Sequence, residues 1–181
     1  MEAMRKLTLL RHAKSSWDDP EKTDFERPLA PRGRRAALKI AAFLARHHLN
    51  PDFILCSPAQ RTRETLARIL PFLTEDIEIR MDRAVYSAGI GDGLVAYLKT
   101  RPADNQHIMI IGHNPTMQQL ALTLAKPDQA GQYSEMERKF PSAALAHIEF
   151  DISSWRELKS DGRLMHFVLP KNLKGNKGGA V

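Results

Sequence analysis

Short apolar runs alternate along the chain with longer segments whose apolar residues recur at helical spacing. The runs that we predict as strands are Lys6 to Leu10, Phe53 to Cys56, Ile77 to Met81, His107 to Ile111, Ala144 to Phe150 and Leu164 to Leu169. Strands that alternate with helices build a layered fold around a largely parallel sheet. We therefore predict an α/β protein, a three-layer α/β/α sandwich with a mostly parallel central sheet.

Helical periodicity is clearest after Gly33. Apolar residues there fall at positions i, i+3, i+4 and i+7, a stripe that would face the sheet: Ala37, Ile40, Ala41 and Leu44. A further helix is expected within Gly89 to Lys99, and the polar segment from Lys126 to Ser142 is expected to form a loop.

Two predicted strands are followed by residues typical of a helix start. Ser57-Pro58 follows the second strand, and Asn114-Pro115 follows the strand His107 to Ile111. Ser and Asn are favoured N-cap residues, and proline is favoured at the first helical position. We expect the two helices to begin there, with backbone N–H groups directed at the strand ends.

Length and composition favour one ordinary soluble domain. The chain has 181 residues, of which 43% are hydrophobic and 27% charged, and we expect one domain over residues 1–170 and a flexible tail over 171–181. The net charge is +6, but the chain has no dense basic run of the kind that nucleic-acid-binding proteins contain. No apolar window is long enough to span a bilayer. The single Cys56 excludes an intrachain disulfide and favours the cytoplasm. The oligomeric state stays open.

Candidate chemistry gathers where the predicted strands end. Arg11 and His12 come at the end of the first strand, Arg61 lies in the first helical turn after the second strand, and His113 follows the strand His107 to Ile111. Because ligands of open α/β sheets bind outside the carboxyl ends of the strands, two arginines and two histidines would converge there. Guanidinium groups match phosphoryl oxygens, and their charge would keep His12 neutral, with a nitrogen free to attack phosphorus.

Three neighbouring residues are weaker candidates for substrate binding. Lys14 and Ser15 follow the first strand and can contact a phosphoryl group or line a solvated loop, and Asn114 opens the helix after His113. Arg27 is expected to pair with a loop carboxylate rather than with substrate. No metal and no cofactor are expected, because Arg11 and Arg61 would repel a cation.

The chain resembles the histidine phosphatase superfamily, which has the phosphoglycerate-mutase-like fold, and within it the SixA-type phosphohistidine phosphatases. The resemblance covers nearly the whole chain. It rests on Arg11-His12-Ala13-Lys14-Ser15-Ser16-Trp17, Asp24-Phe25-Glu26-Arg27-Pro28-Leu29 with Arg32-Gly33, Ser57-Pro58-Ala59-Gln60-Arg61-Thr62-Arg63-Glu64-Thr65, Gly112-His113-Asn114-Pro115 and Phe140-Pro141-Ser142-Ala143. Ala13 stands where the family usually has glycine, a change that is tolerable where the backbone avoids positive φ.

The resemblance implies a covalent mechanism without a metal. His12 would attack the phosphoryl group and form a phosphohistidine that water hydrolyses, while Arg11, Arg61 and His113 stabilise the transferring oxygens. The proton donor for the leaving group is less clear, because the chain has no Glu between Glu78 and Glu135, where many relatives place the acid. Asp24 is our candidate. Its rivals are Asp18 and Asp19.

Three functions fit these residues. The leading one is a metal-independent phosphatase that removes the phosphoryl group from phosphohistidine on a signalling protein. The alternatives are a small-molecule phosphomonoester phosphatase or mutase and a non-catalytic phosphate-binding protein. The partner is accordingly a phosphorylated protein domain or a small phosphomonoester. Short connections from Leu70 to Ile77 and from Tyr97 to His107 leave no room for a helical lid, so we expect an open pocket.

Overall fold

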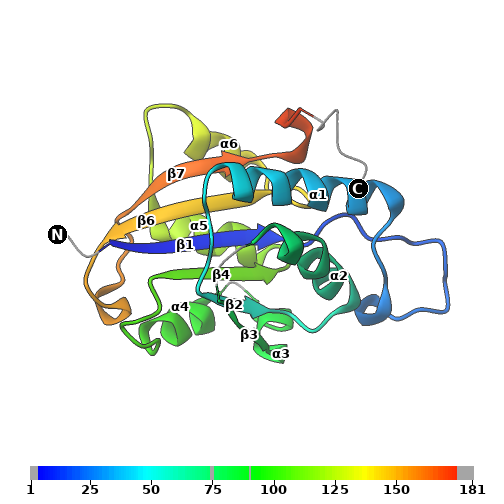
Figure 1. Cartoon of the computed structure of the whole chain (residues 1–181), viewed down its shortest axis with the longest axis horizontal. Coiled ribbons are helices and arrows are strands. Elements are labelled where there is room, and N and C mark those ends of the chain that lie inside the picture. The colour runs from blue at the N-terminus through cyan, green and yellow to red at the C-terminus, as the bar shows by residue number, and fades with distance from the viewer. Residues whose placement is uncertain (1–3, 74–75, 90, 175–181) are drawn as a thin grey trace.

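A seven-stranded sheet forms the centre of the computed structural model, which describes residues 4–73, 76–89 and 91–174 (Figure 1). The strands are β1 (Met4–Arg11), β2 (Phe53–Cys56), β3 (Glu78–Met81), β4 (His107–Gly112), β5 (Ala125–Lys126), β6 (Leu145–Asp151) and β7 (Gly162–Val168). Their order is β3-β2-β4-β1-β6-β7-β5, and β6 alone runs against its neighbours. The predicted mostly parallel sheet is confirmed, and β5 is an additional strand.

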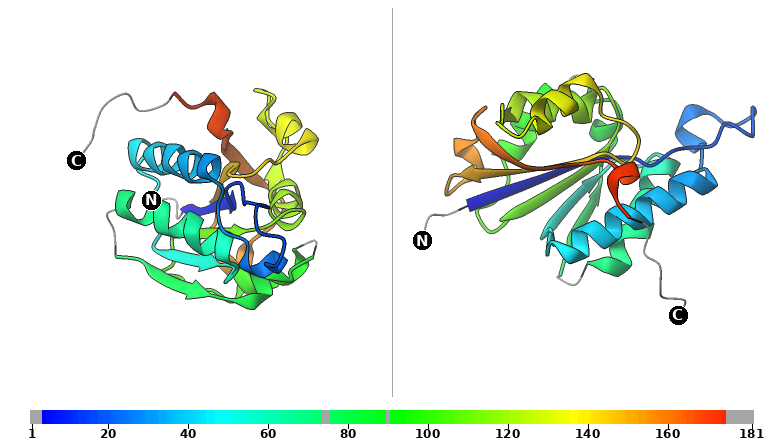
Figure 2. Two further views of the ribbon diagram at one scale, coloured as in Figure 1. Left: turned by 90° about the vertical axis from the view of Figure 1, so that its right-hand side faces the viewer. Right: turned by 90° about the horizontal axis from the view of Figure 1, so that it is seen from above.

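Helices cover both faces of this sheet (Figure 2). One face carries α1 (Pro31–Arg46) and α2 (Gln60–Ile69), and the other carries α4 (Asp92–Lys99), α5 (Thr116–Leu124) and α6 (Gln132–Arg138). The short helices are α3 (Arg83–Tyr86), η1 (Asp24–Glu26), η2 (Leu70–Phe72), η3 (Trp155–Glu157) and η4 (Pro170–Asn172). This is the three-layer arrangement that the sequence predicts. In the described ranges, no helix has the length and apolar character needed to cross a membrane.

The central strands are buried because each lies between two layers of helices. Every residue of β2 and β4 is buried, as expected for parallel strands that are covered on both faces. In β1, Leu7 and Leu9 pack into the core under α4 and α5, whereas Leu10 packs under α1 and α2. This two-sided packing fixes the strand register, and the register in turn fixes where each strand ends.

Both helices begin later than predicted, α2 by two residues and α5 by one. Helix α2 begins at Gln60 after an Ala59 N-cap, and α5 begins at Thr116 after a Pro115 N-cap. The Ser57 hydroxyl is 2.7 Å from Nε2 of His113, and the Asn114 amide donates to the carbonyl oxygen of Phe140 at 2.9 Å. Both polar side chains therefore make tertiary contacts, and Ser57 in addition accepts from the Ala59 amide at 3.3 Å, a local bond of the expected kind.

Two segments that we expected to be irregular contain structure. The predicted loop from Lys126 to Ser142 includes α6 and the last residue of β5. The predicted tail begins with η4, and the ammonium of Lys39 donates to the carbonyl oxygen of Leu173 at 3.0 Å, so residues 171–174 pack on α1. The rest of the predicted tail, 175–181, lies outside the described residues.

A chain of buried polar groups crosses the sheet at Thr8. Nδ1 of His107 lies 3.0 Å from the carbonyl oxygen of Asn50, so Nδ1 carries the proton and Nε2 accepts from the Thr8 hydroxyl at 2.8 Å. The hydroxyl oxygen in turn accepts from Nδ1 of His147 at 2.9 Å. Burial lowers the pKa of His107 to about 4 and that of His147 to about 3, so both rings are neutral.

These two histidines should make the protein less stable in mild acid. Their pKa values are near 6.5 in the unfolded chain and lower in the folded one, so below pH 6.5 the unfolded state binds protons that the folded state excludes. Each ring should then cost up to about 1.4 kcal/mol of unfolding free energy per pH unit between pH 6.5 and its folded pKa. Urea unfolding at pH 7.5, 6 and 5 measures the summed loss from these two rings and from His12 and His113, whose pKa values are lowered as well.

The control is His48→Asn, since His48 is exposed and has φ of 52°, a conformation that asparagine adopts readily. This variant should show the same fall in stability as the unmodified protein. If the unfolding free energy stays constant from pH 6.5 to pH 5, His107 and His147 are not buried as neutral rings.

Candidate active site

Three neighbouring strand ends form one pocket of about 350 Å³. Arg11 of β1 lies opposite Gly112 of β4, and Cys56 of β2 lies opposite Ile111. The parallel register therefore brings together the residues that follow each strand. The pocket is lined by Arg11, His12, Lys14, Ser15, Trp17, Asp24, Arg27, Arg61, His113, Asn114 and Ser142. Every catalytic and binding candidate from the sequence lies in this set, whereas Asp18 and Asp19 do not.

His12 presents an unprotonated nitrogen to the pocket. Its Nδ1 lies 2.8 Å from the carbonyl oxygen of Ala13, which can only accept, so Nδ1 carries the proton. Nε2 accepts from Nε of Arg61 at 3.3 Å. Burial, together with the charges of Arg61 and Arg11, lowers the pKa of His12 to about 3. The ring is therefore neutral at physiological pH, and its lone pair is on Nε2.

His113 is held in the opposite tautomer beside His12, with ring centroids 5.2 Å apart. Its Nδ1 accepts from Nη2 of Arg61 at 3.2 Å. Nε2 therefore carries the proton and donates to Oγ of Ser57 at 2.7 Å. Burial and the nearby Arg61 charge lower the pKa of His113 to about 4. Ser57 thus orients this imidazole, a role that its place in the sequence does not reveal.

The two arginines have different supports. Arg61, in the first turn of α2, contacts both histidines and also pairs with the Asp24 carboxylate at 2.9 Å. Arg11 donates through Nη1 to the carbonyl oxygen of Phe140 at 2.8 Å. Asn114 donates to that same oxygen. One backbone carbonyl therefore orients two of the predicted site residues.

Asp24 lies at the edge of the pocket as an ion-paired carboxylate. Oδ2 accepts from Nη2 of Arg61 at 2.9 Å and from the Tyr86 hydroxyl at 3.0 Å, and Oδ1 lies 3.4 Å from Arg27. Partial burial raises the pKa of this carboxyl, but the hydrogen bonds from Arg61 and Tyr86 outweigh it, and the net pKa is below its ordinary value. Asp24 is therefore ionised at neutral pH.

Several residues in the pocket or next to it were not predicted as members of the site. Tyr86 reaches Asp24 from α3 and packs edge-on against His113, with ring centroids 5.2 Å apart. Arg27 pairs with a loop carboxylate as expected, and with Trp17 it also lines the pocket. Trp17 and Arg27 belong to the motifs quoted above, whereas no pattern in the sequence indicates Tyr86.

The loop after β1 is fixed by residues that do not line the pocket. The Ala13 amide donates to Oγ1 of Thr65 at 3.0 Å, and Thr65 donates to the carbonyl oxygen of Arg61 at 2.7 Å. Of the non-glycine residues described, His48 and Ala143 have positive φ. Ala13 does not, so the expectation for this position is confirmed. Within the part of the chain that the structure describes, no group of three His, Cys, Asp or Glu side chains could hold a metal ion.

Sequence comparisons place these residues in a known family. A sequence model of the histidine phosphatase superfamily (branch 1) matches residues 7–92. The uncharacterised protein Rv1276c of Mycobacterium tuberculosis is 35% identical over 166 residues, which cover 90% of this chain and 100% of the relative. A chloroplastic protein of Arabidopsis thaliana is 37% identical over 131 residues, which cover 67% of this chain and 59% of that protein.

Solved structures agree with this match. A structure assigned as the phosphohistidine phosphatase SixA of Nakamurella multipartitia has a TM-score of 0.78 and 28% identity, over 92% of this chain and 96% of the other. A structure from Agrobacterium tumefaciens, also assigned as SixA, has a TM-score of 0.76 and 28% identity, over 92% of this chain and 99% of the other. The chain belongs to the histidine phosphatase superfamily. Within this superfamily it is of the SixA type, with the phosphoglycerate-mutase-like fold.

Gly33 of this SixA-type chain gives a direct test of how the pocket loop is supported. A Cβ at Gly33 would lie 2.1 Å from the carbonyl oxygen of Lys14, which also accepts from the amide of Ala30 at 2.9 Å. Gly33→Ala should therefore push the loop away from α1. We expect it to destabilise the protein by about 1–3 kcal/mol and to lower phosphatase activity, measured by thermal unfolding and steady-state kinetics.

Gly93→Ala is the matched control. Gly93 lies in α4, where an added Cβ meets no atom within 4 Å, so alanine should raise stability slightly through its helix propensity. If Gly33→Ala and Gly93→Ala behave alike, close packing of Gly33 against Lys14 does not support the site.

Proposed function

We propose that this protein is a metal-independent phosphatase in which His12 is the nucleophile and a phosphohistidine is the intermediate. The observation that carries the proposal is the unprotonated Nε2 of His12, which lies 3.3 Å from the Arg61 guanidinium in a pocket that Arg11 also lines. A neutral imidazole nitrogen is a good nucleophile, and fixed guanidinium groups bind the phosphoryl oxygens that it attacks.

The reaction follows from these positions in two displacements. The lone pair on Nε2 forms a bond to phosphorus while the bond to the leaving group breaks, and that group departs with the electron pair. Water then attacks the phosphorus, the bond to Nε2 breaks, and orthophosphate is released. Arg11, Arg61 and His113 are placed to stabilise charge on the transferring oxygens, and Ala13 holds the proton on Nδ1 throughout.

Lys14, Ser15 and Asn114 are proposed to bind the substrate or to position groups that do. Lys14 and Ser15 line the pocket and can reach a phosphoryl oxygen or the group behind it. Asn114 and Arg11 both donate to the Phe140 carbonyl oxygen, so the amide is held beside this guanidinium. Its own Oδ1 is buried without a hydrogen-bond partner among the described residues.

The state of Asp24 favours phosphohistidine on a protein as the substrate. Asp24 remains our candidate proton donor, yet it is ionised in the resting site and is therefore a weak acid there. An alkoxide leaving group requires a proton from the enzyme, whereas a phosphohistidine that is protonated on its other ring nitrogen already carries one and leaves as neutral imidazole, a much weaker base. The relatives named SixA are assigned to phosphohistidine, which supports the same choice.

His12→Asn should abolish turnover of N-phosphoimidazole and of a phosphohistidine-bearing protein domain, because asparagine lacks the attacking nitrogen. Phosphate release is measured in EDTA, and an acid-labile phosphate on the unmodified enzyme is measured after a rapid quench. His48→Asn serves as the control and should retain both signals. If the His12→Asn variant still releases phosphate, His12 is not the nucleophile. Tight phosphate binding without a phosphoenzyme would indicate the non-catalytic alternative.

Asp24→Asn separates the two substrate classes. If Asp24 delivers a proton, its loss should lower kcat for an alkyl phosphate such as glycerol phosphate by about 100-fold, the usual contribution of a general acid. Turnover of N-phosphoimidazole should fall much less. Comparable losses on both substrates would show that Asp24 acts by holding Arg61, and rapid hydrolysis of alkyl phosphates by the unmodified enzyme would favour a small-molecule phosphatase.

A further inference from the structure

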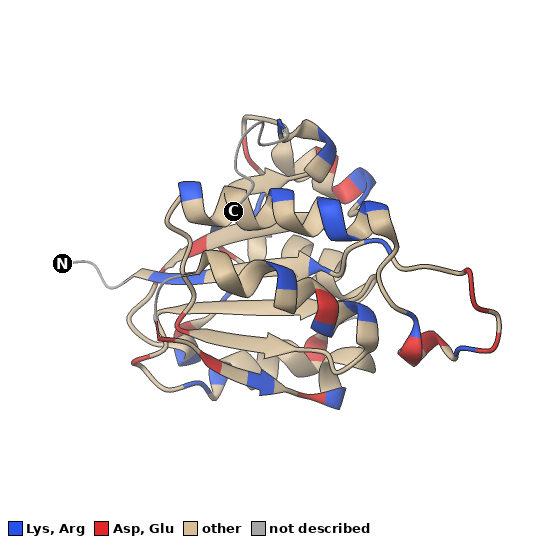
Figure 3. Cartoon of the chain, turned by 45° about the vertical axis from the view of Figure 1, so that its right-hand side comes forward, with Lys and Arg blue, Asp and Glu red and all other residues tan. Residues whose placement is uncertain are grey.

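The segment from Ser16 to Glu26, here called the 16–26 loop, reaches out from the body of the molecule between β1 and α1 (Figures 1 and 2). Residues 18–26 contain five carboxylates and one lysine, in a chain whose net charge is +6 (Figure 3). The loop therefore places a concentrated negative charge beside a pocket that is lined by Arg11, Lys14, Arg27 and Arg61.

Trp17, on this loop, is held open to solvent at the pocket. Its exposed fraction is 70%, and the guanidinium carbon of Arg27 lies 3.4 Å from the centre of its ring. Arg27 is itself 7% exposed and is anchored by Ser15 at 2.8 Å and by Asp24 at 3.4 Å. A buried cation thus fixes one face of the indole, and exposed tryptophans in fixed positions are typical anchors of protein interfaces.

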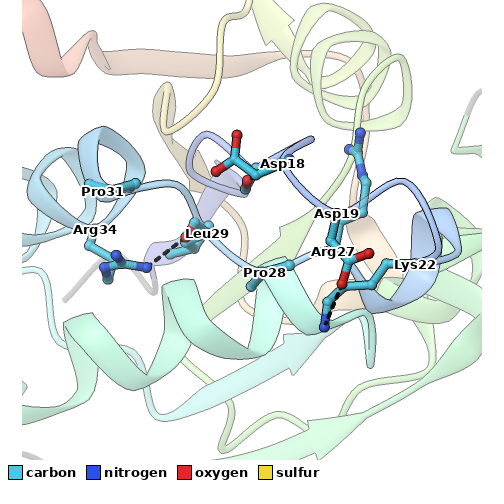
Figure 4. Close-up of a pocket in the computed structure, with 9 residues that line it drawn as sticks. Asp18, Asp19, Lys22, Arg27, Pro28, Leu29, Pro31 and Arg34 are labelled. Atoms are coloured by element: carbon cyan, nitrogen blue, oxygen red, sulfur yellow. Dashed lines mark hydrogen bonds and ion pairs between the residues drawn. The ribbon is translucent and has the colours of Figure 1, made fainter.

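Arg27 is only partly satisfied within the protein. Its Nε and Nη1 are buried and have no hydrogen-bond partner among the described residues. Arg27 also lines a second pocket of about 310 Å³, next to the catalytic one (Figure 4). Figure 4 shows Asp18, Asp19 and Lys22 on the loop side of this second pocket and Pro31 and Arg34 on the α1 side. Unpaired donors on a buried cation point to a surface that a ligand completes.

The carboxylates of the loop differ in how they are used. Asp24 pairs with Arg61, Asp19 pairs with Lys22 at 3.8 Å, and Glu26 accepts from Thr23 at 2.7 Å. Asp18 and Glu21 are exposed and form no ion pair among the residues that the structure describes. They can therefore pair with cations of another molecule.

We propose that the 16–26 loop docks the protein that carries the phosphohistidine. Trp17 covers apolar surface beside the phosphorylated residue, and Asp18 and Glu21 pair with Lys or Arg side chains of the partner. The partner surface is thus basic, since an acidic loop repels nucleic acids and anionic membranes alike. This inference rests on the proposed function and specifies the substrate as a protein with basic residues near its phosphohistidine.

Two phosphohistidine peptides of equal length test the docking surface, one with lysines and one with serines around the phosphorylated residue, together with N-phosphoimidazole. The unmodified enzyme should prefer the lysine peptide by about five-fold or more in kcat/KM, since each exposed ion pair contributes a factor of up to about five. Asp18→Lys/Glu21→Lys should abolish this preference and leave turnover of N-phosphoimidazole unchanged. Trp17→Ala should lower kcat/KM for both peptides more than for N-phosphoimidazole.

Asp104→Lys/Asp161→Lys is the matched control, because it makes the same change in net charge at exposed positions outside the loop and outside both pockets. This variant should keep the preference for the lysine peptide. Equal rates on the two peptides, or an equal loss of the lysine-peptide preference in both double variants, would overturn the proposal that the 16–26 loop is a docking surface. Failure to hydrolyse N-phosphoimidazole and both peptides would instead overturn the proposed function.

Discussion

The site depends on two neutral imidazoles held within hydrogen-bond distance of one guanidinium. Arg61 donates to both His12 and His113, so a proton on either accepting nitrogen would place like charges in contact in a partly buried pocket. This constraint keeps the accepting nitrogen of His12 unprotonated. It also leaves arginine charge facing the pocket, which a phosphoryl dianion would balance. The nucleophilicity and the anion binding that we propose therefore have one physical origin.

The supporting contacts explain why the motifs contain residues that do not line the pocket. Ser57 selects the tautomer of His113, Thr65 ties the amide of Ala13 to the backbone of Arg61, and Gly33 lets α1 approach the carbonyl of Lys14. The contacts of Thr65 and Gly33 join the end of β1 to α2 and α1, and the contact of Ser57 joins the end of β2 to the end of β4. Parallel strands bring the candidate site residues to one edge, and these contacts orient them there.

The convergence of the site could be predicted from sequence because it follows from strand direction alone. Apolar runs located β1, β2 and β4, and residues after the ends of parallel neighbours must meet. Helix starts could not be predicted in the same way, because a local cap competes with a distant partner. Asn114 binds its distant partner, Phe140, and Ser57 combines a local bond to the Ala59 amide with a shorter one to His113. Strand β5 has two residues, too few for periodicity, and Tyr86 reaches Asp24 across 62 positions of sequence.

Asp24 connects the chemistry to the loop that surrounds it. Its carboxylate pairs with Arg61, which faces both histidines, and with Arg27, which supports the ring of Trp17. An acid that protonates leaving groups has to be free to carry a proton, whereas this carboxylate is held ionised between two arginines. The ionised Asp24 carboxylate is therefore a weak acid in the resting site, and it holds both guanidinium groups in place. That arrangement suits the substrate that we propose, whose leaving group is a weak base and whose bulk would lie outside the pocket, against Trp17.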